Sequence, residues 1–143
     1  MKKLCVILIL AAVCMGLLAC APKKMPAVSE LAIEGVGFAS IGPDNKVQMD
    51  VVKADTPLFL YVEKIGEFAN VNGEIQPKVI VEIPETQFKS DFFGSVIKTE
   101  GQTMDSSTFP LGALASGTYT VKLTVKDLLA GTEANVQEQL VVP

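Results

Sequence analysis

The chain has 143 residues, of which 49% are hydrophobic, and its 12 basic and 16 acidic side chains give a net charge of −4. This length suits one compact domain with an appendage, and the acidic balance argues against a nucleic-acid surface, which needs a basic face. Every basic residue is a lysine, and histidine and tryptophan are absent. The chain therefore lacks the usual general base and zinc ligand and the arginine fork that captures phosphate. We expect neither an enzyme nor a cofactor.

The first 19 residues are typical of a secretory signal peptide. Lys2 and Lys3 precede an apolar run of 16 residues, Leu4–Ala19, which is shorter than the roughly 20 residues of a spanning helix. All three cysteines, Cys5, Cys14 and Cys20, fall within the first 20 residues. The rest of the chain therefore has no disulfide and no thiol chemistry.

The sequence Leu17-Leu18-Ala19-Cys20 resembles the lipobox of bacterial lipoproteins. The resemblance implies transfer of a diacylglyceryl group to Cys20, cleavage before it, and acylation (palmitate, for example) of the new amino terminus. Several acyl chains hold a protein on a bilayer because each buried methylene contributes about 0.8 kcal/mol. The alternatives are an uncleaved anchor and an ordinary secretory signal, and Cys14 fits the motif less well because Val13 is β-branched.

The residue after the lipobox cysteine is Ala21 and not an aspartate. By the sorting rule of lipoproteins, this implies the outer membrane if the organism has two membranes. Residues 20–30, with Pro22 and Pro26, read as a flexible tether after the lipidated cysteine. We expect residues 31–143 to form one domain with a single core.

Period-two alternation predicts β-strands along most of this domain. The clearest segment is Thr118–Lys126, whose apolar side chains share one face. Lys46–Lys53, with Val47, Met49 and Val51 inside, and Lys78–Ile83, ended by Pro84, repeat the pattern. The further strand candidates are Leu31–Ser40, with a bulge at Gly35 and Gly37, Leu58–Ile65, Ser95–Thr99 and Ala134–Val142.

Turn-forming residues such as Gly42-Pro43-Asp44-Asn45 and Asn72-Gly73 separate these segments. Seven to eight short strands with no convincing helix predict an antiparallel β-sandwich. A small closed barrel would give the same pattern.

The segment from Leu114 through Gly117 to Tyr119 resembles the tyrosine corner of immunoglobulin-like sandwiches. In that corner a tyrosine hydroxyl reaches a main-chain group a few residues upstream, so the ring is buried while its polar end finds a partner. The resemblance covers about the last 30 residues and implies an immunoglobulin-like fold. It carries little information about function.

Catalytic and metal-binding interpretations are weak for this chain. Serines are present, but no histidine can activate them. Carboxylates alone could bind Ca²⁺ or hydrolyse glycosides, although no Asp-x-Asp-x-Asp run occurs and turn aspartates ordinarily bond the backbone. The aspartates in or near predicted loops are Asp44, Asp50, Asp55, Asp91, Asp105 and Asp127. We assign no metal ligand.

The segment Pro57–Val62 is apolar on both faces, with Phe59 and Tyr61 opposite its other apolar residues. Only one face can meet the core. The second face is covered within the chain, for which Phe88, Phe92 and Phe93 are candidates, or it is left for a partner. The predicted partner surface therefore comprises Phe59, Tyr61, Phe92 and Phe93.

Taken together, these features predict a lipid-anchored, non-catalytic immunoglobulin-like sandwich in the bacterial cell envelope. It would be attached to the membrane through Cys20 and would act by protein–protein contact or in envelope assembly. A module for a small ligand or Ca²⁺ in the loops, and more remotely a hydrolase that uses carboxylates only, remain as alternatives.

Overall fold

The computed structural model describes residues 27–143, which form ten β-strands and one 3-10 helix. The predicted signal peptide, Cys20 and most of the predicted tether lie outside the described residues. The elements in chain order are β1 (Ala32–Ile41), β2 (Val47–Met49), β3 (Pro57–Gly66), β4 (Glu74–Ile75), β5 (Pro77–Ile83), η1 (Pro84–Thr86), β6 (Phe88–Phe93), β7 (Ile97–Lys98), β8 (Met104–Ala113), β9 (Gly117–Asp127) and β10 (Thr132–Val142).

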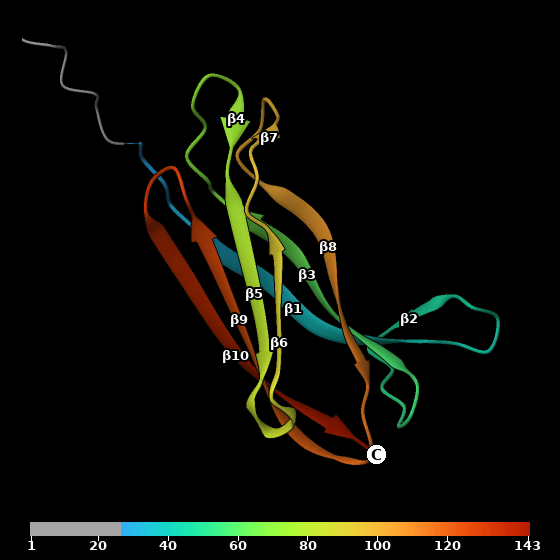
Figure 1. Ribbon diagram of the computed structural model, residues 1–143. Helices are drawn as coiled ribbons and strands as arrows, with labels where there is room; N and C mark the ends of the chain where they lie inside the picture. Colours follow the sequence, from blue (N-terminus) through green and yellow to red (C-terminus); the bar gives the residue numbers. More distant parts are fainter. Residues whose placement is uncertain (1–26) are drawn as a thin grey trace, which may run out of the picture.

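The strands form two four-stranded antiparallel sheets that lie one over the other (Figure 1). The first sheet has the strand order β2-β1-β3-β8, and the second has the order β10-β9-β5-β6. Strands β4 and β7 pair separately as a two-stranded sheet. This arrangement confirms the predicted all-β antiparallel sandwich, with ten strands where seven to eight were expected. Within the described residues no strand pairing joins the two main sheets, so the fold is not a closed barrel.

The core lies between the sheets and is built from the alternating apolar residues of β3, β5 and β9. Every second side chain of a strand points to the same face, and burial of each side chain of this size stabilises the fold by about 1.5–3 kcal/mol. The predictions for Leu58–Ile65, Lys78–Ile83, Thr118–Lys126 and Ala134–Val142 are confirmed. The inward residues exposed by 1% or less are Leu58, Leu60, Val62, Val79, Val81, Ile83, Val121, Leu123 and Val125.

The prediction for Lys46–Lys53 is wrong in both extent and facing. Strand β2 covers only Val47–Met49, and Val47 and Met49 are 50% and 49% exposed. These two side chains are exposed because β2 is an edge strand in a hairpin that projects beyond the body of the sandwich (Figure 1). Alternation shows that a strand has an apolar side, but it does not show that a second layer covers that side.

Two long strands were not predicted. Neither β6, which carries Phe88, Phe92 and Phe93, nor β8 is among the predicted strands. The polar run at the start of β8 and Pro110 within it hide the alternation, while Phe109 and Leu111 are buried in the core. The predicted strand Ser95–Thr99 shrinks to β7.

The glycines of β1 do not form the predicted bulge. Its register on β3 is the same on both sides of Gly35, with Glu34 opposite Lys64 and Val36 opposite Val62. The glycines instead make room for side chains of β3, since a Cβ at Gly37 would overlap the Tyr61 ring and one at Gly35 would overlap Glu63.

Contacts of the domain extend slightly into the predicted tether. The main-chain groups of Glu30 and Glu67 exchange hydrogen bonds of 3.1 and 2.9 Å, and the Ser29 hydroxyl donates to the Glu67 carbonyl at 2.9 Å. The chain therefore enters the fold at the end where β3 finishes.

Candidate functional site

The outer face of the first sheet carries two of the four aromatic residues predicted to contact a partner, Phe59 and Tyr61. Cross-strand pairing places Phe59 beside Ala39, and Ala39 beside Met49, so these side chains share one face. Tyr61 lies next along β3 and, like Phe59, is half-buried. Met49 and Val47 extend this apolar surface onto the projecting hairpin. We call the set Val47, Met49, Phe59 and Tyr61 the apolar outer face.

Tyr61 is fixed across β1. Its ring lies over Gly37, and its hydroxyl donates a 2.5 Å hydrogen bond to Asp50 Oδ1, beyond the end of β2. That hydrogen bond, with some desolvation, raises the pKa of Tyr61 above its usual value of 10.0. The bond therefore attaches the hairpin to the body of the sheet and orients the aromatic ring.

A shallow cavity of about 220 Å³ adjoins the apolar outer face between β2, β3 and β8. The residues that line it are Met49, Tyr61, Val62, Glu63, Ser106, Ser107 and Thr108. Its wall is mainly apolar, with hydroxyl groups on the β8 side.

The structure does not bring Phe92 and Phe93 to the apolar outer face. Both lie on β6 in the second sheet, where Phe92 packs on Phe109 with ring centroids 5.1 Å apart and Phe93 contacts the same ring at 6.4 Å. Phe88 and Phe92 pair with the inward residues Ile83 and Val79, so they face the core. None of the three covers the second face of β3, because they lie across the sandwich.

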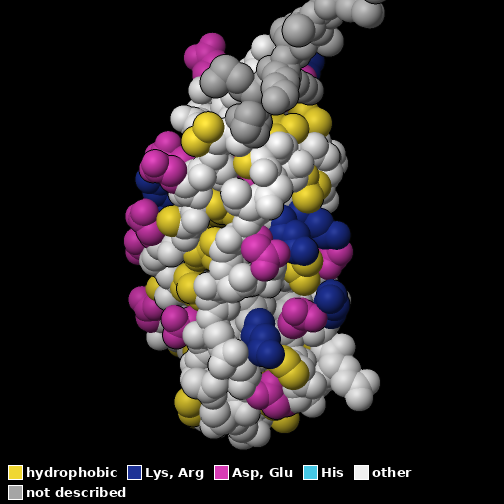
Figure 2. All heavy atoms as spheres, turned by 90° about the vertical axis from the view of Figure 1, so that its left-hand side faces the viewer, with side chains coloured by type: hydrophobic (Ala, Val, Ile, Leu, Met, Phe, Trp, Pro, Cys, Tyr) yellow, Lys and Arg dark blue, Asp and Glu magenta, His cyan; other side chains and the backbone are white. Residues whose placement is uncertain are grey.

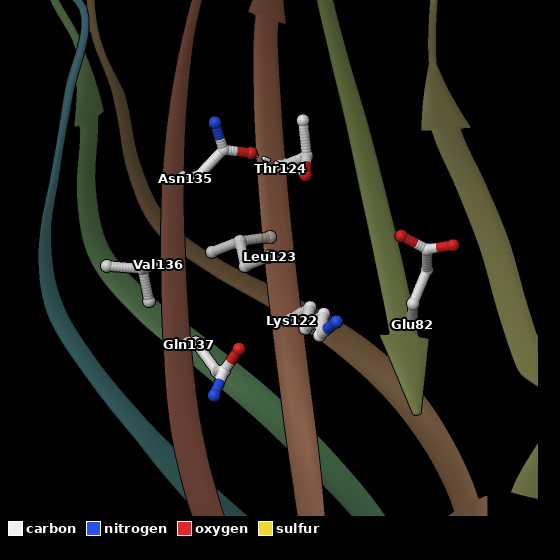
Figure 3. Close-up of a pocket in the computed structure, with 7 residues that line it drawn as sticks. All are labelled: Glu82, Lys122, Leu123, Thr124, Asn135, Val136 and Gln137. Atoms are coloured by element: carbon white, nitrogen blue, oxygen red, sulfur yellow. Dashed lines mark hydrogen bonds between the residues drawn. The ribbon is translucent and has the colours of Figure 1, made fainter. Parts of the chain in front are cut away.

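The outer face of the second sheet is polar (Figure 3). A hollow of about 230 Å³ lies over β5, β9 and β10, and the labelled side chains beside it include Glu82, Lys122 and Gln137. Thr124 donates a 2.7 Å hydrogen bond to Asn135 within it, and Lys89 pairs with Glu82 at 3.1 Å. These groups satisfy one another along the sheet, which is typical of a solvated face.

The predicted tyrosine-corner residues lie together before and within β9. The Tyr119 hydroxyl donates to the Ala115 carbonyl at 2.9 Å, four residues upstream. Leu114 is in the core, and its carbonyl accepts the Asp55 N–H at 2.9 Å. Gly117 lies under the Tyr119 ring. The corner joins the β8–β9 turn to the core.

Four of the six aspartates in or near the predicted loops bond to other groups through their side chains, and the six do not gather. Asp44 pairs with Lys46 at 3.5 Å, and Asp91 pairs with Lys78 at 3.0 Å. Asp127 is buried and accepts three main-chain N–H groups, including that of Ala69 at 2.6 Å. Across residues 27–143 no three acidic side chains lie close enough to hold a metal ion, and no helix there could cross a membrane.

No protein-family model matches the chain, and no curated protein matches it significantly.

Proposed function

We propose that this chain is a lipid-anchored protein of the bacterial cell envelope whose immunoglobulin-like domain binds another protein and catalyses no reaction. The apolar outer face is the observation that carries the proposal. Val47 and Met49 are about half exposed, and they continue a surface whose other members, Phe59 and Tyr61, are only half covered. Exposed apolar surface of this kind marks interaction sites in soluble domains.

The anchoring half of the proposal rests on the lipobox resemblance. Cys20 carries the acyl chains, and the segment up to Ser29 gives reach, since Ser29 is the first of residues 27–143 with a side-chain hydrogen bond to the domain. Nine residues span at most about 30 Å. The partner therefore lies near the surface of the bilayer that holds this protein, which is the outer membrane if the organism has two membranes.

Mass spectrometry of the mature protein tests the anchor. We expect an amino-terminal Cys20 carrying the mass of acyl chains and recovery in the membrane fraction. Cys20→Ala should abolish acylation, whereas the control Cys14→Ala should leave it unchanged. An unmodified amino terminus in the aqueous fraction would contradict the anchoring.

Photo-crosslinking in cells tests the binding half. A photoreactive amino acid at Met49 of the full chain should give a discrete crosslinked product, because this side chain lies on the apolar outer face. The same amino acid at Lys122, on the polar face of the second sheet, should give none. Equal yields at the two positions would argue against a specific binding face.

A further inference from the structure

A groove runs along the side of the sandwich between β1 and β10. It has a volume of about 330 Å³, and its walls include Val36, Phe38 and Val52 on one side and Glu138 and Gln139 of β10 on the other. Figure 2 views this side and shows apolar side chains between charged ones, with acidic side chains predominating along one margin. Three apolar side chains and two carboxylates, those of Asp50 and Glu138, line the groove.

Main-chain groups of β1 face this groove. Strand β2 pairs with β1 only from Ala39 to Ile41, and the Asp50 N–H extends that ladder by bonding to the Phe38 carbonyl at 2.9 Å. Val36 lies two residues earlier, so its N–H and carbonyl point to the same side. Among the described residues no strand pairs with β1 there, and β10 pairs only with β9. The groove therefore offers an open strand edge.

The charge of the groove selects for a basic occupant. Glu138 occupies an inward position on β10, between the apolar residues Val136 and Leu140, yet it is exposed. Asp50, whose Oδ1 accepts the Tyr61 hydroxyl, also lines the groove. The residues that line the groove include two carboxylates and no lysine. An inward charge on an edge strand, such as Glu138, also discourages that edge from pairing with a second copy of this acidic chain.

We propose that this groove binds an extended, lysine- or arginine-bearing segment of the partner protein, which adds as a strand to the edge of β1 near Val36. Its main chain pairs with β1, its apolar side chains enter between Val36, Phe38 and Val52, and its basic side chains meet Glu138 and Asp50. This inference rests on the proposed function and specifies the chemistry of the partner.

The test uses the full mature protein in neutral detergent and a capped eight-residue peptide of alternating lysine and valine. We expect saturable binding by calorimetry and slower hydrogen exchange at the Val36 amide in the complex. Glu138→Lys should weaken binding about tenfold. The control Glu133→Lys, the same charge change on the outer face of β10, should weaken it less than about twofold. Glu138→Gln replaces Glu138→Lys if the latter does not fold.

Several results would overturn the inference. These are absence of binding, equal weakening by the two lysine variants, equal binding of a glutamate–valine peptide, or equal binding of a peptide with two central prolines, which cannot pair as a strand. A dimer in sedimentation experiments that Glu138→Lys dissociates would assign the groove to a second copy instead. If the peptide fails while the Met49 crosslink persists, the groove inference falls and the proposed function stands.

Discussion

At the scale of single residues, Asp127 is the buried charge that joins the two sheets. Its carboxylate lies at the end of β9, and it accepts hydrogen bonds from Ala69, in the loop after β3, and from Leu129 and Ala130 in its own turn. Removing a buried acceptor leaves its donors without partners, which costs about 1–3 kcal/mol for each such loss.

Asp127→Ala should therefore lower the free energy of unfolding by about 3 kcal/mol or more. The control Asp91→Ala removes an exposed ion pair with Lys78 and should cost at most about 1 kcal/mol. Urea denaturation of both variants measures the difference. Equal losses would show that the carboxylate does not hold the sheets together.

Ser40 is the opposite case, a buried polar group without a partner. Its side chain on β1 is fully buried, and its hydroxyl is the only buried side-chain nitrogen or oxygen in residues 27–143 that lacks a hydrogen bond. Ser40→Ala should stabilise the protein by about 1 kcal/mol, because an unpaired hydroxyl costs free energy to desolvate. A thermal melt that falls on this substitution would indicate a partner for the hydroxyl.

Sequence reasoning reached some of these residues and missed others. The Leu114–Tyr119 segment was recognisable because the ring and its hydroxyl bond are local in the chain. In the sequence, Asp127 is only one of several aspartates in or near loops, because its bond to Ala69 spans 58 residues and no local pattern reports such a contact. Ser40 looked like one end of a strand.

At the scale of elements, the facing of β2 makes a direct prediction. Met49→Ala on this edge strand should change the free energy of unfolding by less than about 0.5 kcal/mol. Leu60→Ala, on the inward face of β3, should cost about 2–5 kcal/mol because it leaves a cavity in the core. The two variants are compared by chemical denaturation. A large loss for Met49→Ala would mean that β2 packs against an additional layer.

The 3-10 helix η1 carries a second element-scale prediction, on pH. The Glu85 carboxylate accepts the Thr120 N–H of β9 at 2.9 Å. A hydrogen bond from its own main chain, followed by that to Thr120, lowers the pKa of Glu85 below its usual value of 4.5. Because the folded pKa is the lower one, this contribution to stability is complete above about pH 4.5 and is lost as the pH falls through the folded pKa.

Glu85→Gln should therefore lower the free energy of unfolding slightly at neutral pH and flatten the acid side of the stability–pH profile, so that the variant and the parent protein converge at low pH. Glu100→Gln, in a turn outside the strands, serves as the control and should leave the slope intact. An unchanged slope in Glu85→Gln would show that Glu85 does not report the contact between η1 and β9.

Strands are predictable from the sequence where the alternating apolar residues are also the buried ones. The prediction fails where an alternating strand is uncovered or a buried strand does not alternate clearly. Strands β5 and β9 are covered by the opposite sheet, so their apolar residues are inside. Strand β2 has the same alternation without a covering layer, and β8 is buried around Pro110 without clear alternation. The pairing of distant strands decides which apolar side is inside, and a single strand's pattern does not contain that information.

At the scale of the whole molecule, the two sheets have different outer faces. The second sheet presents mutually paired polar groups, whereas the first sheet presents the apolar outer face and borders the acidic groove. The sequence predicts that β3 has a second apolar side. It places Phe92 and Phe93 on the same surface as Phe59 and Tyr61, but β6 belongs to the opposite sheet. The fold class was predictable from strand spacing, and the sidedness was not.

We propose that another protein covers the apolar outer face in the cell envelope. Hydroxyl-radical oxidation of the full chain, in isolated envelopes and after purification, measures this coverage at Met49. We expect Met49 oxidation to be slowed several-fold in the envelope, while Phe93, which is 52% exposed on the opposite sheet, reacts equally in both samples. Equal oxidation of Met49 in the two samples would contradict the account.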